Sequence, residues 1–156
     1  MEIINGERLV LGTCYYPEHW DESLWRDDLK RMLENGIEVI RIAEFAWSKI
    51  ERYEGVFNYD FFDRFLDVAA DMGMKVIFCT PTATPPAWLT EKYPEVLNAN
   101  MDGVLYRHGG RRHYNYNSPK YQELTRIIVE KSASHYAKHP AIIGWQIDNE
   151  INCEKN

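Results

Sequence analysis

The chain has 156 residues, of which 45% are hydrophobic and 27% are charged, and this composition is typical of a globular domain and not of a disordered segment. The net charge is −6 and the only local gathering of basic residues lies within positions 107–112, so the sequence offers no extended basic surface for nucleic acid. The first ten residues carry several charges and no long apolar run, which favours a cytoplasmic protein without a signal peptide or membrane anchor.

The cysteines favour a reducing compartment. They stand at positions 14, 79 and 153, and we expect Cys14 and Cys79 to lie on strands that are separated by a third strand. Such strands are about 10 Å apart, which exceeds the roughly 7 Å between Cα atoms that a disulfide can bridge. The sequence therefore predicts free thiols.

The first strand is expected at residues 8–16, where apolar residues surround Gly12. No Gly-x-Gly-x-x-Gly motif follows it, which argues against a dinucleotide-binding fold. Asp21 is placed to cap a helix that ends at Asn35-Gly36. The apolar face of this helix consists of Trp25, Leu29, Met32 and Leu33.

Strands and helices then alternate. A second strand is expected at residues 39–42, a helix at 60–72 that stops at Gly73, and a third strand at 75–80. This alternation predicts a parallel sheet with right-handed connections.

The connection that follows, residues 81–117, is far longer than usual. A short helix can begin near Pro85, but residues 98–117 show neither a helical nor a strand period. This segment is dense in Tyr, His and Arg, a composition that favours a functional loop over a disordered one.

A further helix begins with Ser118 as its cap and Pro119 at its first position, and it is expected to close at residues 139–140. His135 and His139 are four residues apart, a spacing that can hold a metal. Tyr136 stands where a metalloprotease helix carries Glu. We therefore favour two histidines that complement the helix dipole in its last turn.

The stretch at residues 142–150 is the centre of the functional argument. Its first half is rich in Ile and predicts a fourth strand buried on both faces, and its second half is Asp148-Asn149-Glu150. The carboxyl ends of parallel strands are where ligands bind, so Glu150 is the candidate catalytic group. The alternative is an ordinary solvated turn.

The chain resembles the N-terminal part of a glycoside hydrolase family 42 β-galactosidase. The matching motifs keep the order and spacing of that family and cover nearly all of the chain. They lie at residues 12–20, 41–47, 80–89, 110–114 and 144–150.

The resemblance implies an α/β fold, namely the first four β/α units of a (β/α)8 TIM barrel with parallel strands in the order 1-2-3-4. It also implies hydrolysis of terminal non-reducing β-D-galactose, in galactosides or oligosaccharides, with retention of configuration and without a cofactor. Glu150 matches the general acid/base of the family, Asn149 a sugar-binding residue and Arg111 the substrate-binding arginine. The nucleophile, a second Glu, would lie beyond Asn156.

Retaining hydrolysis needs two carboxyl groups about 5 to 5.5 Å apart, so Glu150 is expected in a partly desolvated pocket that faces the second one. Some family members bind zinc through a cysteine cluster, but Asn115 stands where one of its ligands would fall. We therefore predict no metal site of that kind.

A (β/α)8 barrel takes roughly 250 residues, so residues 1–156 are expected to be an incomplete catalytic domain and a fragment of the parent enzyme. The isolated chain is expected to be inactive and to self-associate through unpaired strand edges. The sequence leaves a homo-oligomeric parent enzyme open.

Two other functions remain as alternatives. A half-barrel could bind sugar or serve as a scaffold without chemistry. A metal-dependent barrel hydrolase could use Glu44, Asp148 and Glu150 as ligands. In addition, Arg111 or Arg112 could serve only as a loop-anchoring ion pair.

Overall fold

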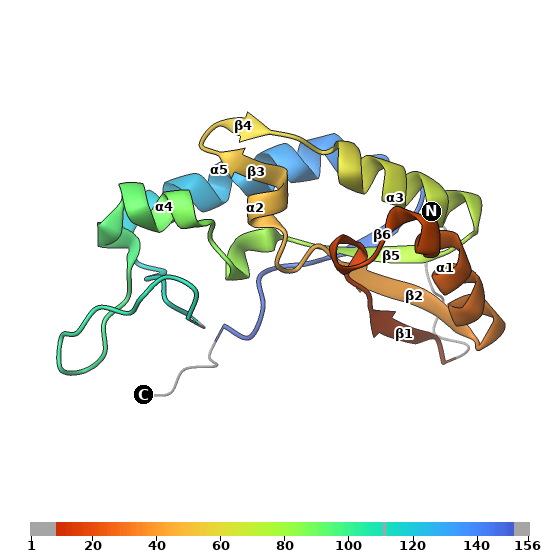
Figure 1. Ribbon diagram of the computed structural model, residues 1–156, viewed down its shortest axis with the longest axis horizontal. Helices are drawn as coiled ribbons and strands as arrows, with labels where there is room; N and C mark the ends of the chain where they lie inside the picture. Colours follow the sequence, from red (N-terminus) through yellow and green to blue (C-terminus); the bar gives the residue numbers. More distant parts are fainter. Residues whose placement is uncertain (1–8, 111, 152–156) are drawn as a thin grey trace. The chain divides into compact units, whose positions relative to one another are not determined.

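The computed structural model describes residues 9–110 and 112–151, which form two compact units (Figure 1). The sheet unit contains the described residues up to Ala43 together with Tyr59–Cys79 and Tyr136–Ile147. The loop unit contains Glu44–Asn58, Thr80–His135 and the described residues from Asp148 onward. Each unit is described by itself.

The sheet unit is built on four parallel strands: β1 (Leu11–Cys14), β2 (Ile37–Ile42), β5 (Lys75–Cys79) and β6 (Ile142–Gln146). Their order in the sheet is β1-β2-β5-β6. The expected order 1-2-3-4 is corrected accordingly, because two short strands that the sequence did not predict, β3 and β4, intervene along the chain and form a separate sheet. A parallel α/β sheet is confirmed.

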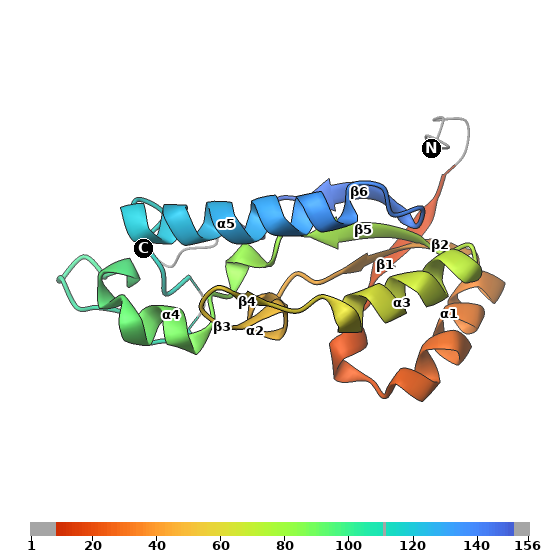
Figure 2. The ribbon, with the colours of Figure 1, turned by 90° about the horizontal axis from the view of Figure 1, so that it is seen from above.

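Two helices, α1 (Trp25–Glu34) and α3 (Asp60–Asp71), pack side by side against this sheet (Figure 2). Their contact is aromatic, because the rings of Trp25 and Phe65 meet edge to face with centroids 5.1 Å apart and Tyr15 stacks on Phe65 at 5.7 Å. All three side chains are buried. Both helices confirm the prediction from apolar spacing.

The sequence signals for helix ends hold in part, because the N-cap of α1 is Leu24, which makes no side-chain cap bond, and Asp21 caps the turn before it. Asp21 accepts a hydrogen bond from the backbone N–H of Ser23, and so caps the short 3-10 turn η2 (Glu22–Leu24) that leads into α1. A second 3-10 turn, η1 (Pro17–His19), precedes it. Beyond α3, Gly73 has φ 76°, a left-handed conformation that glycine adopts without steric cost.

The outer strands, β1 and β6, are the edges of the four-stranded sheet in the described residues, as predicted for a chain that supplies half of a barrel. β1 is exposed along its length, and β6 is half-buried at all five positions. The prediction of a fourth strand buried on both faces is wrong for the described chain, because β6 pairs with β5 alone. Cys14 and Cys79 are free thiols, as predicted from the strand spacing.

The loop unit begins with α2 (Trp47–Ile50) and the antiparallel hairpin of β3 (Glu51–Tyr53) and β4 (Val56–Phe57), seen beside it in Figure 1. Buried Glu51 holds this hairpin, since its carboxylate accepts hydrogen bonds from the indole of Trp47 at 2.7 Å and the backbone N–H of Gly55 at 2.7 Å.

The rest of the loop unit contains η3 (Pro81–Ala83), α4 (Ala87–Lys92), η4 (Pro94–Val96) and α5 (Pro119–Tyr136). Between η4 and α5 the chain is pinned by isolated antiparallel bridges, Leu97 with Tyr114 and Ala99 with Leu105. The described part of the segment that lacks a period in the sequence, residues 98–110 and 112–117, is therefore a loop held by these bridges.

Helix α5 starts as predicted, because the hydroxyl of Ser118 accepts a hydrogen bond from the backbone N–H of Tyr121 at 3.4 Å. It ends at Tyr136, before the expected residues 139–140. Only His135 therefore lies in the last turn, and His139 instead lies 3.7 Å from the carboxylate of Asp67. Within residues 9–110 and 112–151, no helix combines the length and apolar character needed to cross a membrane.

Candidate active site

The polar turn after β6 has an unusual backbone. Asp148 has φ 57° and Glu150 has φ 46°, so two non-glycine residues on either side of Asn149 adopt the left-handed conformation. Such residues are held only where the surrounding structure determines them strongly. The side chains differ in exposure: Asp148 is buried, Asn149 is half-buried and Glu150 is exposed.

Asp148 is the residue that determines this turn. Its backbone N–H donates to the hydroxyl of Thr80 at 2.8 Å, and the hydroxyl of Thr82 donates to its Oδ2 at 2.9 Å. Its Oδ1 accepts a hydrogen bond from the backbone N–H of Asn149 at 2.6 Å. The turn is thereby joined to the segment that follows β5.

Arg112 joins a third segment to the same carboxylate. Its Nη1 lies 2.9 Å from Oδ1 of Asp148, and the two side chains are only 2% and 9% exposed. The same nitrogen donates to the hydroxyls of Tyr114 and Tyr116, and Tyr116 donates to Asp148 at 3.2 Å. Burial raises the pKa of both tyrosines, so their hydroxyls keep the proton that they donate.

His113, next to this ion pair, fixes the loop backbone. Its Nδ1 lies 2.7 Å from the carbonyl oxygen of Gly110. A carbonyl can only accept, so Nδ1 carries the proton. His113 is 3% exposed, and burial lowers its pKa, so the ring is neutral near pH 7. The bond holds the backbone of Gly110, which lines the pocket described next.

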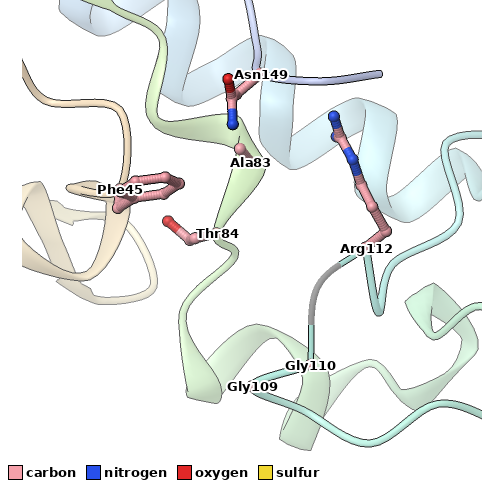
Figure 3. A pocket seen from close by; sticks show the side chains of 7 residues that line it. All are labelled: Phe45, Ala83, Thr84, Gly109, Gly110, Arg112 and Asn149. Carbon is pink, nitrogen blue, oxygen red and sulfur yellow. The ribbon is translucent and has the colours of Figure 1, made fainter. Parts of the chain in front are cut away.

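A pocket lies among these segments of the loop unit (Figure 3). Figure 3 shows the amide of Asn149 and the ring of Phe45 directed toward the same space, which Thr84 also lines. A flat apolar ring with hydroxyl, amide and guanidinium groups suits a ligand that has both apolar faces and hydroxyls. The lining residues are Phe45, Ala83, Thr84, Gly109, Gly110, Arg112 and Asn149.

The pocket residues come from chain segments that follow sheet strands. Phe45 follows β2, Thr84 follows β5 and Asn149 follows β6. In α/β enzymes with parallel strands, the residues after the strands form the active site. The lining residues of the pocket therefore occupy the positions in the sequence, just after the strands, that are expected of an active site in such a sheet.

The predicted site residues are placed as follows. Asn149 lines the pocket, and Glu150 follows it in an exposed position, so a partly desolvated surrounding for Glu150 is not found in the described chain. Arg111 lies outside the described residues. Its neighbour Arg112 lines the pocket and forms a buried ion pair, which is the loop-anchoring role that the sequence left open for either arginine.

Sequence reasoning missed the role of Asp148 as the residue that joins three segments. The sequence suggested it only as a metal ligand with Glu44 and Glu150. In residues 9–110 and 112–151, no three His, Cys, Asp or Glu side chains are grouped so that they could hold a metal ion. The one available signal was a carboxylate after a buried strand together with a surplus of arginine in the long loop.

The fold is an α/β fold with a parallel sheet, and segments that follow its strands line a pocket. Comparison with known proteins gives the family. Residues 14–156 match the model of glycoside hydrolase family 42, described as beta-galactosidase, and the chain belongs to this family. Beta-galactosidase BgaA from Thermus sp is 46% identical over 144 residues, which are 92% of this chain and 22% of that protein. Beta-galactosidase Bga from Halorubrum lacusprofundi is 43% identical over 145 residues, which are 93% of this chain and 21% of that protein.

Solved structures agree with the sequence relatives. The beta-galactosidase from the psychrophilic Marinomonas ef1 superposes with a TM-score of 0.90 at 43% identity, over 93% of this chain and 22% of that one. The beta-galactosidase from Halorubrum lacusprofundi gives a TM-score of 0.89 at 42% identity, over 94% of this chain and 22% of that one. The chain thus spans about a fifth of the length of the relatives that it matches.

Proposed function

We propose that the gene product that carries these residues at its natural length, hereafter the full-length protein, is a retaining β-galactosidase that removes terminal non-reducing β-D-galactose. The observation that carries the proposal is the Asn149-Glu150 pair, which directly follows a strand of the parallel sheet and reaches the pocket through Asn149. Membership in the family supports the same activity. The described strands and helices are the first half of a (β/α)8 barrel in this proposal, and the protein is cytoplasmic.

The reaction divides the work between two carboxyl groups. Glu150 donates its proton to the glycosidic oxygen as the bond to the sugar carbon breaks, and a second carboxylate attacks that carbon and forms a glycosyl-enzyme bond. Glu150 then accepts a proton from the water that displaces the enzyme carboxylate, so both protons pass through one residue. The second carboxylate belongs to a Glu outside this sequence.

Substrate binding falls to Asn149 and Arg111. The half-buried amide of Asn149 can both donate to and accept from sugar hydroxyls, and it already points into the pocket (Figure 3). The ring of Phe45 supplies an apolar wall. A galactoside or an oligosaccharide with terminal galactose is the substrate that this combination fits.

The test of Glu150 is the dependence of the rate on the leaving group. Glu150→Gln in the full-length protein should lower kcat/KM for an alkyl galactoside by about 10²–10⁴-fold, the range of general acid catalysis, and much less for a dinitrophenyl galactoside, whose leaving group needs no proton. Exposed Glu95→Gln is the matched control and should leave both values unchanged. Equal losses on the two substrates would contradict the acid assignment.

The test of Arg111 separates binding from loop anchoring. Arg111→Ala should raise KM and lower kcat together, because a side chain that binds sugar hydroxyls also orients the ring. Exposed Arg107→Ala is the control from the same loop. A lower melting temperature with unchanged inhibition by galactose would assign Arg111 an anchoring role only.

A further inference from the structure

Asp148 makes more connections than a turn residue needs. Its carboxylate accepts hydrogen bonds from Arg112, Tyr116, Thr82 and the backbone N–H of Asn149, and its own N–H donates to Thr80. The partners come from the segment after β5, from the long loop and from the turn itself. Three segments of the loop unit therefore meet at one buried carboxylate.

These bonds act on the backbone that presents the candidate acid. Oδ1 of Asp148 holds the N–H of Asn149, and the peptide on the far side of Asn149 leads to Glu150. Asp148 and Glu150 are both left-handed, a conformation that a non-glycine residue leaves readily unless bonds oppose the change. Loss of the bonds to Asp148 would let both residues relax and would reorient the side chain of Glu150.

We propose that Asp148, held by its ion pair with Arg112 and its hydrogen bonds to Thr80 and Thr82, is the positioning residue for the acid/base Glu150. This role rests on the proposed function. Asp148 does not touch the reacting atoms in this proposal. It fixes the direction in which the turn presents the carboxyl group of Glu150.

Burial explains why the turn uses a charged residue. The guanidinium of Arg112 has further buried N–H groups, at Nε and Nη2, without a hydrogen-bond partner among the described residues, so the ionised carboxylate is its principal compensation there. Hydrogen bonds between charged groups are short and directional. The side chains of Arg112 and Asp148 are only 2% and 9% exposed, so little water competes for their pair.

Two variants test the positioning role of Asp148, one by a large change to its bonds and one by a small change. Asp148→Asn keeps the size of the side chain and removes the charge, whereas Thr82→Val removes only the hydroxyl that donates to Oδ2. The matched control is Thr90→Val, because Thr90 is also buried but its hydroxyl bonds to the carbonyl oxygen of Ala87 and to Nδ1 of His108 and not to Asp148. Each variant is made in the full-length protein and again in the Glu150→Gln background.

The readout is kcat/KM for alkyl and dinitrophenyl galactosides, which reports the step that Glu150 assists. Asp148→Asn should lower the alkyl value by about 10²-fold, the loss typical of an ångström-scale misplacement of a catalytic group. Thr82→Val should lower it by about 10-fold. Both should change the dinitrophenyl value by less than about 3-fold, and neither should lower activity further once Glu150 is Gln, because coupled residues are not additive.

A purely structural role of Asp148 would give a different pattern of kcat/KM values for the two substrates. If the alkyl and dinitrophenyl values fall together, or if the losses persist in the Glu150→Gln background, Asp148 acts on the fold or on sugar binding and the positioning role is overturned. If Asp148→Asn fails to fold, Thr82→Val decides by the same criteria. If Glu150→Gln alone shows no dependence on the leaving group, the acid assignment itself fails and the positioning role fails with it, an outcome that the single variant identifies.

Discussion

The two units bury different kinds of side chain. Every buried polar or charged residue among the described ones lies in the loop unit, whereas the described buried residues of the sheet unit are apolar, apart from the hydroxyl groups of Tyr15 and Tyr136 and the thiol of Cys79. The ion pair of Arg26 with Asp71 in the sheet unit is exposed. The buried polar residues are Glu44, Glu51, Thr80, Thr82, Thr90, Arg112, His113, Ser118, Ser132 and Asp148.

The difference in buried side chains indicates that the sheet unit supports the fold and that the loop unit carries the candidate site. Apolar packing is tolerant of detail, since hydrophobic residues of about the right size fill a core. A buried polar network is not, because each unsatisfied donor or acceptor costs free energy. The loop unit thus gains fixed directions for its polar groups, which a binding or catalytic site needs, and depends on each member of the network for them.

The largest loss of stability is expected for a substitution in the core of the sheet unit. Phe65 is fully buried between Tyr15 and Trp25, so Phe65→Ala should lower the free energy of unfolding by about 3–5 kcal/mol through lost burial and the cavity left behind. Urea denaturation of the full-length protein measures it. Half-buried Phe61→Ala is the control and should cost clearly less. Equal costs would mean that the sheet unit does not depend on this core.

Breaking the buried ion pair of Arg112 and Asp148 should cause the second-largest loss of stability. Arg112→Met leaves the carboxylate of Asp148 buried without its counter-charge, which should cost about 3 kcal/mol of unfolding free energy. The double variant Arg112→Met/Asp148→Leu removes both charges and should recover most of that loss. If the double variant is as unstable as the single one, the network does not depend on the charge pair.

A smaller, pH-dependent effect is expected at His113. Because burial lowers its pKa below the usual 6.5, the unfolded chain takes up a proton before the folded chain does. Stability should therefore be complete above pH 6.5 and fall as the pH drops from there toward the lower folded pKa. His113→Gln should remove this part of the acid sensitivity, as seen in melting temperatures between pH 7 and pH 5. Exposed His19→Gln is the control, and identical curves for all three proteins would contradict the prediction.

The smallest effect is expected at the surface of the sheet unit. Arg26 and Asp71 pair at 2.7 Å, but their side chains are 60% and 63% exposed. Arg26→Ala should change the free energy of unfolding by less than about 1 kcal/mol, the usual range for exposed pairs, as chemical denaturation would show. A loss comparable to that of Arg112→Met would erase the distinction between the two units.

The elements of the sheet unit could be predicted from the sequence because they are long enough to show a period. Apolar spacing located α1 and α3, and Gly73 marked the end of the latter. The hairpin of β3 and β4 was missed, since strands of three and two residues show no alternation. The burial of β6 was overestimated, because an Ile-rich run does not reveal how many neighbours a strand has.

The site could be predicted only in part. Its position at Asn149 and Glu150 follows from a polar turn after an apolar strand and from the family resemblance. The connections of Asp148 could not be predicted, because Thr82, Arg112 and Asp148 are distant in the sequence and meet only in the folded loop unit. The pairing of Arg112 with Asp148 likewise depends on how the long loop folds, which the sequence does not reveal.

The left-handed residues at the site place selection for stability in conflict with selection for activity. Glycine would adopt φ near 46° at Glu150 without steric cost, so a chain selected only to fold would be free to use it at that position. Glycine does not offer the carboxylate that transfers a proton. Evolution toward greater thermal stability in this lineage should therefore proceed through the sheet unit and leave this turn strained.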